Sequence, residues 1–149
     1  MEISKKTDLN DLVKTGTVLE FFSAYQELDI NRMLGLCDQH GEVTFEPLGD
    51  AGKGKINELG KNLWLGLMDS FPDLDNTVIS SEADNQGNII AKVNIHGTQE
   101  KDFANIPSKN LRFGSDHIFI FHFNEQGLID KININWDHSS FCSQLGLEV

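Results

Sequence analysis

The sequence predicts an α+β fold in which three N-terminal helices pack on the concave face of a curved antiparallel sheet. Apolar residues before Pro72 recur mostly at helical spacing, whereas the later segments are runs rich in Val, Ile and Phe. The turn sequences DNQGN at 84–88 and NEQG at 124–127 join such runs as hairpins. Helices followed by a meander of strands indicate α+β architecture, and 149 residues fit one domain, 1–149.

The expected helices each have a start or stop signal. We place them at residues 7–28, 30–37 and 56–70. Asp29 is a favoured N-cap for the second helix, and Pro72 helps to end the third. Gly41 is expected to end the unit formed by the first two helices.

The expected strands are enriched in β-branched and aromatic residues. We place them at residues 42–47, 77–84, 89–98, 111–123 and 128–136. Between the first strand and the third helix, GDAGKGK at 49–55 is expected to be a loop, and it lacks the pattern of a phosphate-binding loop.

The composition excludes several classes of partner. A net charge of -11 repels nucleic acid and anionic membranes. The start of the sequence has no apolar run of signal-peptide length, and no apolar run is long enough for a membrane-spanning helix. Cys37 and Cys142 have no metal-ligand spacing, and no histidines are paired for a metal. We therefore expect a cytoplasmic protein and no metal site.

A strongly curved sheet covered by helices forms a cone whose open end is a natural pocket for a small molecule. Phe45, Trp64 and Phe71 are candidates to line this pocket, which would take a small hydrophobic ligand. The alternative is that these rings only fill the core.

Asp137 is the first candidate for catalysis. It ends the apolar strand in INWDHSSFCSQLG, residues 134–146. Low-dielectric surroundings would raise the pKa of a carboxyl group there toward the range that suits proton transfer. The alternative role is the N-cap of a helix formed by SSFCSQL.

His122 is the second candidate for catalysis. It lies between Phe121 and Phe123, so its side chain is expected on the opposite face of the strand from these rings. The hairpin places it across from residues in the low 130s, from where it would reach toward Asp137 in one pocket. The alternative is a core histidine bonded to a backbone carbonyl. The remaining histidines are interpreted as structural or surface residues: His40, His96, His117 and His138.

The last strand leaves two alternatives for the pocket wall. Alternation puts Ile132, Ile134 and Trp136 on one face and Asn133, Asn135 and Asp137 on the other. If the apolar face lines the pocket, Asp137 points away unless a bulge re-aims it. If the polar face does, a homodimer formed through the sheet would bury the apolar stripe, and we expect such a homodimer. Asn133, Asn135 and Trp136 are therefore counted among the candidate substrate-binding residues.

Four motifs carry a family resemblance. They are FPDL at 71–74, HGTQEKDFANIP at 96–107, FHFNEQGLIDKI at 121–132 and the spacing from Asp137 to QLG at 144–146. Together they resemble the SnoaL-like polyketide cyclases, also called predicted ester cyclases, of the nuclear-transport-factor-like superfamily with its cystatin-like α+β barrel. The resemblance implies that Asp137 is the general acid/base and His122 a second pocket residue. It also implies a cofactor-free intramolecular aldol ring closure of a small hydrophobic ligand that carries a carbonyl group.

The sequence departs from the family pattern in two regions. In the loop over the pocket mouth, other residues replace a histidine, two glycines and a Thr-Gly pair: Gln99, Lys101, Asn105, Lys109 and Asn110. In the last strand, Asn133 replaces the family's tryptophan, and Trp136 lies next to Asp137 instead. Isomerase, dehydratase or hydrolase chemistry stays open, as does a non-catalytic role as a small-molecule-binding or dimerisation module.

Overall fold

The computed structural model describes residues 2–147, and the side chains of residues 10–147. The α-helices are α1 (Glu2–Gln26), α2 (Ile30–Gly35), α3 (Lys61–Ser70) and α4 (His138–Gln144). A 3₁₀ segment, η1 (Glu46–Gly52), and one π-helical segment, η2 (Ile56–Gly60), lie between them. The strands are β1 (Cys37–Phe45), β2 (Lys53–Lys55), β3 (Asp75–Ala83), β4 (Ile89–Thr98), β5 (Arg112–Phe123) and β6 (Ile129–Trp136).

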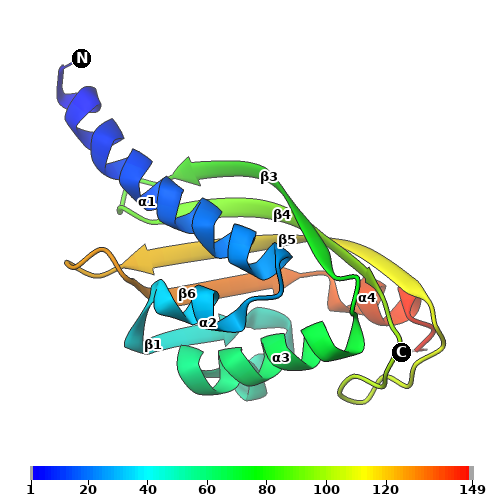
Figure 1. Ribbon diagram of the computed structural model, residues 1–149. Helices are drawn as coiled ribbons and strands as arrows, with labels where there is room; N and C mark the ends of the chain where they lie inside the picture. The colour runs from blue at the N-terminus through cyan, green and yellow to red at the C-terminus, as the bar shows by residue number, and fades with distance from the viewer. Residues whose placement is uncertain (1, 148–149) are drawn as a thin grey trace.

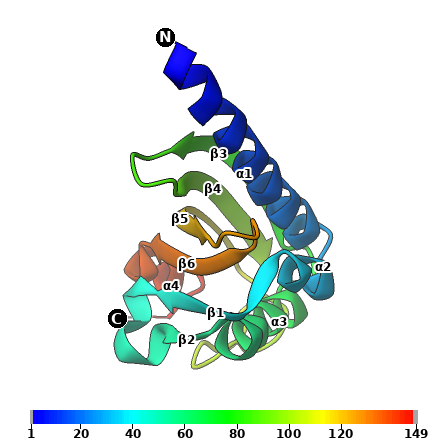
Figure 2. The same ribbon diagram turned by 90° about the vertical axis from the view of Figure 1, so that its left-hand side faces the viewer.

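The strands form one curved sheet with the order β2-β1-β6-β5-β4-β3. Neighbouring strands are antiparallel except β1 and β6, which pair in parallel. Figures 1 and 2 show α1, α2 and α3 on the same side of this sheet. The predicted α+β fold, with helices packed on one face of a curved sheet, is confirmed.

The core lies between the helices and the concave face of the sheet. Phe21 and Phe22 of α1 meet Phe119 and Phe121 of β5 edge to face, at centroid distances between 4.9 and 5.7 Å. Such aromatic pairs add to the stabilisation that burial of the rings provides. The C-terminal half of α1 is therefore anchored in the core, whereas its N-terminal half extends beyond the sheet (Figure 1).

Caps and turns follow the signals in the sequence. The Asp29 carboxylate accepts a hydrogen bond from the Arg32 backbone N–H at the start of α2. Gly87 and Gly127 have positive φ angles of 80° and 82° in the β3–β4 and β5–β6 turns, as the two predicted hairpins require.

Several boundaries differ from the prediction, and three of the differences have a clear structural reason. Gly41 does not end a helix but is buried inside β1, where a Cβ atom would come within 2.8 Å of Ile56 Cδ1 and 3.2 Å of the Asp130 carbonyl oxygen. The expected loop at 49–55 ends in the short strand β2, and the third helix begins with the π-helical turn η2. In each case, pairing or packing with a distant segment overrides the local signal.

The burial of side chains along β5 and β6 shows which face of the last strand points into the molecule. Phe119, Ile132 and Ile134 are each at most 2% exposed, so the apolar face points into the molecule. The apolar residues of β5 and β6 are therefore already buried within one chain, and they do not form an exposed stripe. A homodimer is not needed to cover them. The homodimer itself stays a prediction, which light scattering can measure.

Within residues 2–147, no helix is both long enough and apolar enough to cross a membrane.

Candidate active site

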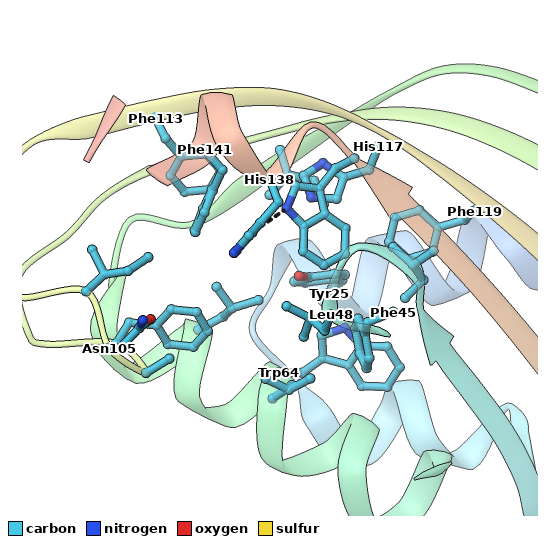
Figure 3. Close-up of a pocket in the computed structure, with 18 residues that line it drawn as sticks. Tyr25, Phe45, Leu48, Trp64, Asn105, Phe113, His117, Phe119, His138 and Phe141 are labelled. Atoms are coloured by element: carbon cyan, nitrogen blue, oxygen red, sulfur yellow. Dashed lines mark hydrogen bonds between the residues drawn. The ribbon is translucent and has the colours of Figure 1, made fainter. Parts of the chain in front are cut away.

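A cavity of about 130 Å³ lies between the concave face of the sheet, α3 and the segment that joins β4 to β5. Aromatic and aliphatic side chains form most of its wall, including Phe45, Trp64, Phe119 and Ile134. An engineered protein cavity of about 150 Å³ holds benzene, so this space suits a molecule of about one ring. Figure 3 shows His117 and His138 reaching the cavity from the sheet side and Trp64 from the α3 side.

Few polar groups interrupt the apolar wall. They belong to Tyr25, Asn105, His117, Trp136 and His138. Among the residues described, no Asp, Glu, Lys or Arg lines the cavity. A charged ligand would therefore lose its hydration without gaining an ionic partner, which favours neutral ligands.

His117 is held as a neutral hydrogen-bond acceptor. It lies on the concave side of β5, and its Nδ1 is 3.2 Å from the Ser115 carbonyl oxygen. A carbonyl oxygen only accepts, so Nδ1 carries the proton and Nε2 keeps a free lone pair. Burial lowers the pKa of His117 to about 4, so the ring is uncharged at neutral pH.

His138 is held with the opposite arrangement of its proton. It is the first residue of α4, and its Nδ1 accepts a hydrogen bond of 3.3 Å from Trp136 Nε1. Indole N–H only donates, so the proton of neutral His138 sits on Nε2. The same ring stacks on Phe141, with centroids 5.9 Å apart. His138 therefore offers a donor where His117 offers an acceptor.

Cys142 is the third partner of His138, with Sγ 3.5 Å from Nε2. This pair does not form a nucleophilic dyad, because the nitrogen facing sulfur carries the proton and cannot remove another one. Burial also raises the pKa of Cys142, which keeps it a thiol.

Tyr25 contributes a second donor to the cavity. It is 2% exposed and is one of the residues that line the cavity. Figure 3 shows the hydroxyl oxygen among the lining side chains. Burial raises the pKa of Tyr25 well above its usual value, so the hydroxyl stays protonated and can donate to a ligand.

The segment over the cavity mouth is tied down by Gln99, one of the residues that depart from the family pattern. Its Nε2 donates to the Ile106 carbonyl oxygen at 2.8 Å, and its backbone carbonyl accepts from Ser108 Oγ at 3.0 Å. Phe103, Asn105 and Ile106 then complete the wall.

Asp137 does not line the cavity. Its carboxylate accepts a 2.9 Å hydrogen bond from the Ser140 backbone N–H and caps α4, and the side chain is exposed. The strand β6 keeps its alternation up to Trp136, so Asp137 falls on the outer side. The expectation that Asp137 opens into the pocket is corrected on this geometry, and the alternative role as an N-cap describes its position.

His122 lies on the outer face of the sheet, as its position between two buried phenylalanines predicts. Its Nδ1 is 2.6 Å from Asp130 Oδ1, and its side chain is 52% exposed. It lines a separate, polar surface depression together with Asp38, His40 and Glu42. His122 and Asp137 therefore do not share a cavity, and the expected pair is not formed.

The other candidate wall residues divide between the cavity, the core and the outer face. Phe45, Trp64 and Trp136 lie on the cavity wall. Phe71 is fully buried behind it and contacts Phe103, Phe113 and Phe141 instead. On the outer face, the Asn133 amide donates to the Glu46 carboxylate, and Asn135 is exposed.

His117, His138 and Tyr25 are the cavity groups that the sequence interpretation missed. For His117 a signal exists, because it has the same parity along β5 as Phe119, Phe121 and Phe123. His138 has no such local signal, because its position depends on how α4 folds back against β5.

Among the residues described, no group of three or more His, Cys, Asp or Glu side chains is arranged to hold a metal ion.

The fold and the cavity define a cone-shaped α+β protein with an apolar cavity inside the cone. No family model matches the sequence, and no curated protein matches it. Solved structures do share the fold. A protein of Jannaschia sp. CCS1 described as a SnoaL-like polyketide cyclase has a TM-score of 0.79 at 14% identity, over 90% of this chain and 92% of that chain.

Two further structures are similar over nearly their whole length. IdmH of Streptomyces antibioticus, described as a polyketide cyclase, has a TM-score of 0.74 at 18% identity, covering 90% of this chain and 99% of its own. TsrD of Streptomyces laurentii has a TM-score of 0.75 at 21% identity, covering 91% of this chain and 96% of its own. At these identities the likeness establishes the shared fold.

Proposed function

We propose that the protein is a cofactor-free acid–base enzyme acting on a small, neutral carbonyl compound, with cyclase chemistry of the SnoaL type. The observation that carries this proposal is the complementary pair of imidazoles on one apolar wall. His117 has a free lone pair on Nε2, and His138 carries its proton on Nε2. An acceptor and a donor without net charge are the two groups that enolisation of a ketone requires.

The reaction is proposed in three steps. His117 Nε2 removes a proton from the carbon next to the substrate carbonyl. The enolate oxygen receives hydrogen bonds from His138 Nε2–H and the Tyr25 hydroxyl. The enolate carbon then attacks a second carbonyl in the same molecule, and protonated His117 returns its proton to the new alkoxide. The ring closes with no net gain or loss of protons.

The low pKa of His117 limits which substrates can react. A base with a pKa of about 4 is weak, so the carbon acid must already be activated. A carbon between two carbonyl groups, as in a β-keto ester or a β-diketone, meets this need. The cavity volume of about 130 Å³ further limits the substrate to a short chain or a molecule of about one ring.

Membership of the SnoaL-like family, also called predicted ester cyclases, is part of this proposal. It rests on the shared fold together with the motifs FPDL and D-x6-QLG in this sequence. A cytoplasmic location is also proposed, and the two buried free thiols, Cys37 and Cys142, support it.

The test is deuterium exchange at the carbon between the carbonyls of a 2-alkyl β-keto ester, followed by NMR in D₂O. We expect exchange above the buffer rate that is lost in His117→Asn, because an amide nitrogen at this place can still bond to Ser115 but cannot accept a proton. Asp137→Asn is the matched control and should retain exchange. Loss of exchange in Asp137→Asn but not in His117→Asn would contradict the proposal and favour Asp137 as the base.

A second candidate function is non-catalytic binding of the same small ligands. The low pKa of His117 favours it, since a weak base still accepts a hydrogen bond from a ligand hydroxyl. Saturable binding of a cyclic ketone without any exchange above the buffer rate would support this function over catalysis.

A further inference from the structure

The side chain of Trp136 contacts both imidazoles of the cavity wall. Its indole ring stacks on His117, with centroids 5.3 Å apart and planes 18° from parallel. Its Nε1–H donates to His138 Nδ1 at 3.3 Å. Because it is the last residue of β6 and His138 the first of α4, the strand end and the helix start fix this contact.

The hydrogen bond from Trp136 decides which form of His138 the cavity contains. A free neutral imidazole exchanges between two tautomers, and which nitrogen is protonated is set by the partner of the other. Trp136 can only donate, so it pairs only with a His138 whose Nδ1 is bare. The partner at Nε2 is the Cys142 sulfur, a weak acceptor, which a ligand oxygen can replace.

We propose that Trp136 is a positioning residue that holds His138 in the Nε2–H tautomer, so that the wall presents a donor to a ligand oxygen. The catalytic importance of this tautomer depends on the proposed function. The tautomer itself is a property of the ligand-free protein and can be measured separately.

The direct test is the ¹⁵N NMR spectrum of the histidine side chains. In the wild-type protein we expect His138 as the Nε2–H tautomer. Trp136→Phe keeps an aromatic ring beside His117 but removes the N–H donor, and the His138 signals should move toward those of a tautomer mixture. Trp64→Phe makes the same chemical change on the opposite wall and should leave the His138 signals unchanged.

Ligand binding gives a second readout that a purely structural role would not move. Trp136→Phe should weaken binding of cyclohexanone about tenfold, the loss expected for one hydrogen bond, and leave binding of methylcyclohexane unchanged. Equal weakening of both probes would mean that Trp136 only shapes the cavity, and would overturn the proposal.

A further variant covers the case in which Trp136→Phe fails to fold. His138→Phe keeps a ring against Phe141 and removes the acceptor, so the Trp136 Nε1–H proton resonance should move upfield. An Nδ1–H tautomer in the wild-type protein, or an unmoved indole resonance, would overturn the proposal. If the tautomer is as expected but no probe is bound and no exchange is catalysed, the proposed function fails while the role of Trp136 stands.

Discussion

The imidazole of His117 lies flat against the indole of Trp136, with 5.3 Å between the ring centroids. This stack joins a titratable ring to one of only two tryptophans in the chain. The other, Trp64, is on the facing wall of the same cavity. The intrinsic fluorescence of the protein therefore comes entirely from the candidate site.

Binding of a small ketone should change the tryptophan fluorescence in a saturable way. A ligand in the cavity would contact Trp64 and Trp136 and so alter the surroundings of both indoles. Titration with cyclohexanone measures this change, and Leu67→Phe, which narrows the cavity, should weaken the response. Saturable binding detected by calorimetry with no change in fluorescence would place the ligand elsewhere.

His117 should make the protein less stable as the pH falls from about 6.5 to about 4. The native ring has a pKa of about 4 and the unfolded ring about 6.5, so within this window the unfolded state binds the proton and the native state does not. The free energy of unfolding is then lower at pH 4.5 than at pH 7.5 by at most about 2 to 3 kcal/mol from this group.

Urea unfolding of the wild-type protein and of His117→Asn at both pH values isolates this contribution. The carboxylates titrate in both proteins, so their effect cancels in the difference. The variant should lose less stability on acidification than the wild type. The same loss in both proteins would show that His117 is protonated freely in the native state.

Asp137 should contribute to stability through the cap of α4. Asp137→Ala removes the acceptor for the Ser140 N–H and should cost about 1 kcal/mol of unfolding free energy. Asp137→Asn keeps a good capping group and should cost less than about 0.5 kcal/mol. Urea denaturation at pH 7.5 measures both values. A large loss in both variants, with ligand binding gone, would point to a role beyond the cap.

The pair of His122 and Asp130 on the outer face should contribute little to stability and nothing to ketone binding. Exposed ion pairs contribute less than about 1 kcal/mol, and the His122 side chain is 52% exposed. His122→Ala and Asp130→Asn should therefore change the unfolding free energy by less than that amount and leave ketone binding unaltered. Weakened ketone binding in His122→Ala would show that the outer face communicates with the cavity.

Much of the fold was predictable because its signals are local. The alternation in β5 and β6, the glycine turns and the Asp29 cap each depend on a few neighbouring residues. The start of β1 was not predictable in this way, because residues 37–41 become a strand only by pairing with β6, about ninety positions away. The same holds for β2, whose three residues depend on pairing with β1.

The candidate site was predictable only in part. The cavity and three of its rings, Phe45, Trp64 and Trp136, follow from the apolar pattern. The sequence analysis chose Asp137 as the catalytic residue. The structure places Asp137 on the outer face and the next residue, His138, on the cavity wall. The spacing of residues predicts neither the hydrogen bond from Trp136 to His138 nor the packing of α4 against the sheet.

The place of β6 between β1 and β5 has a consequence for biosynthesis. Until residues 129–136 leave the ribosome, β1 and β5 each present a bare row of backbone donors and acceptors toward the gap that β6 will fill. Between the release of β5 and the release of β6, the nascent chain therefore has two unpaired strand edges. A polypeptide truncated after Leu128 is expected to aggregate, because both strand edges then stay unpaired. The full chain is expected to depend on a chaperone until β6 has paired with β1 and β5.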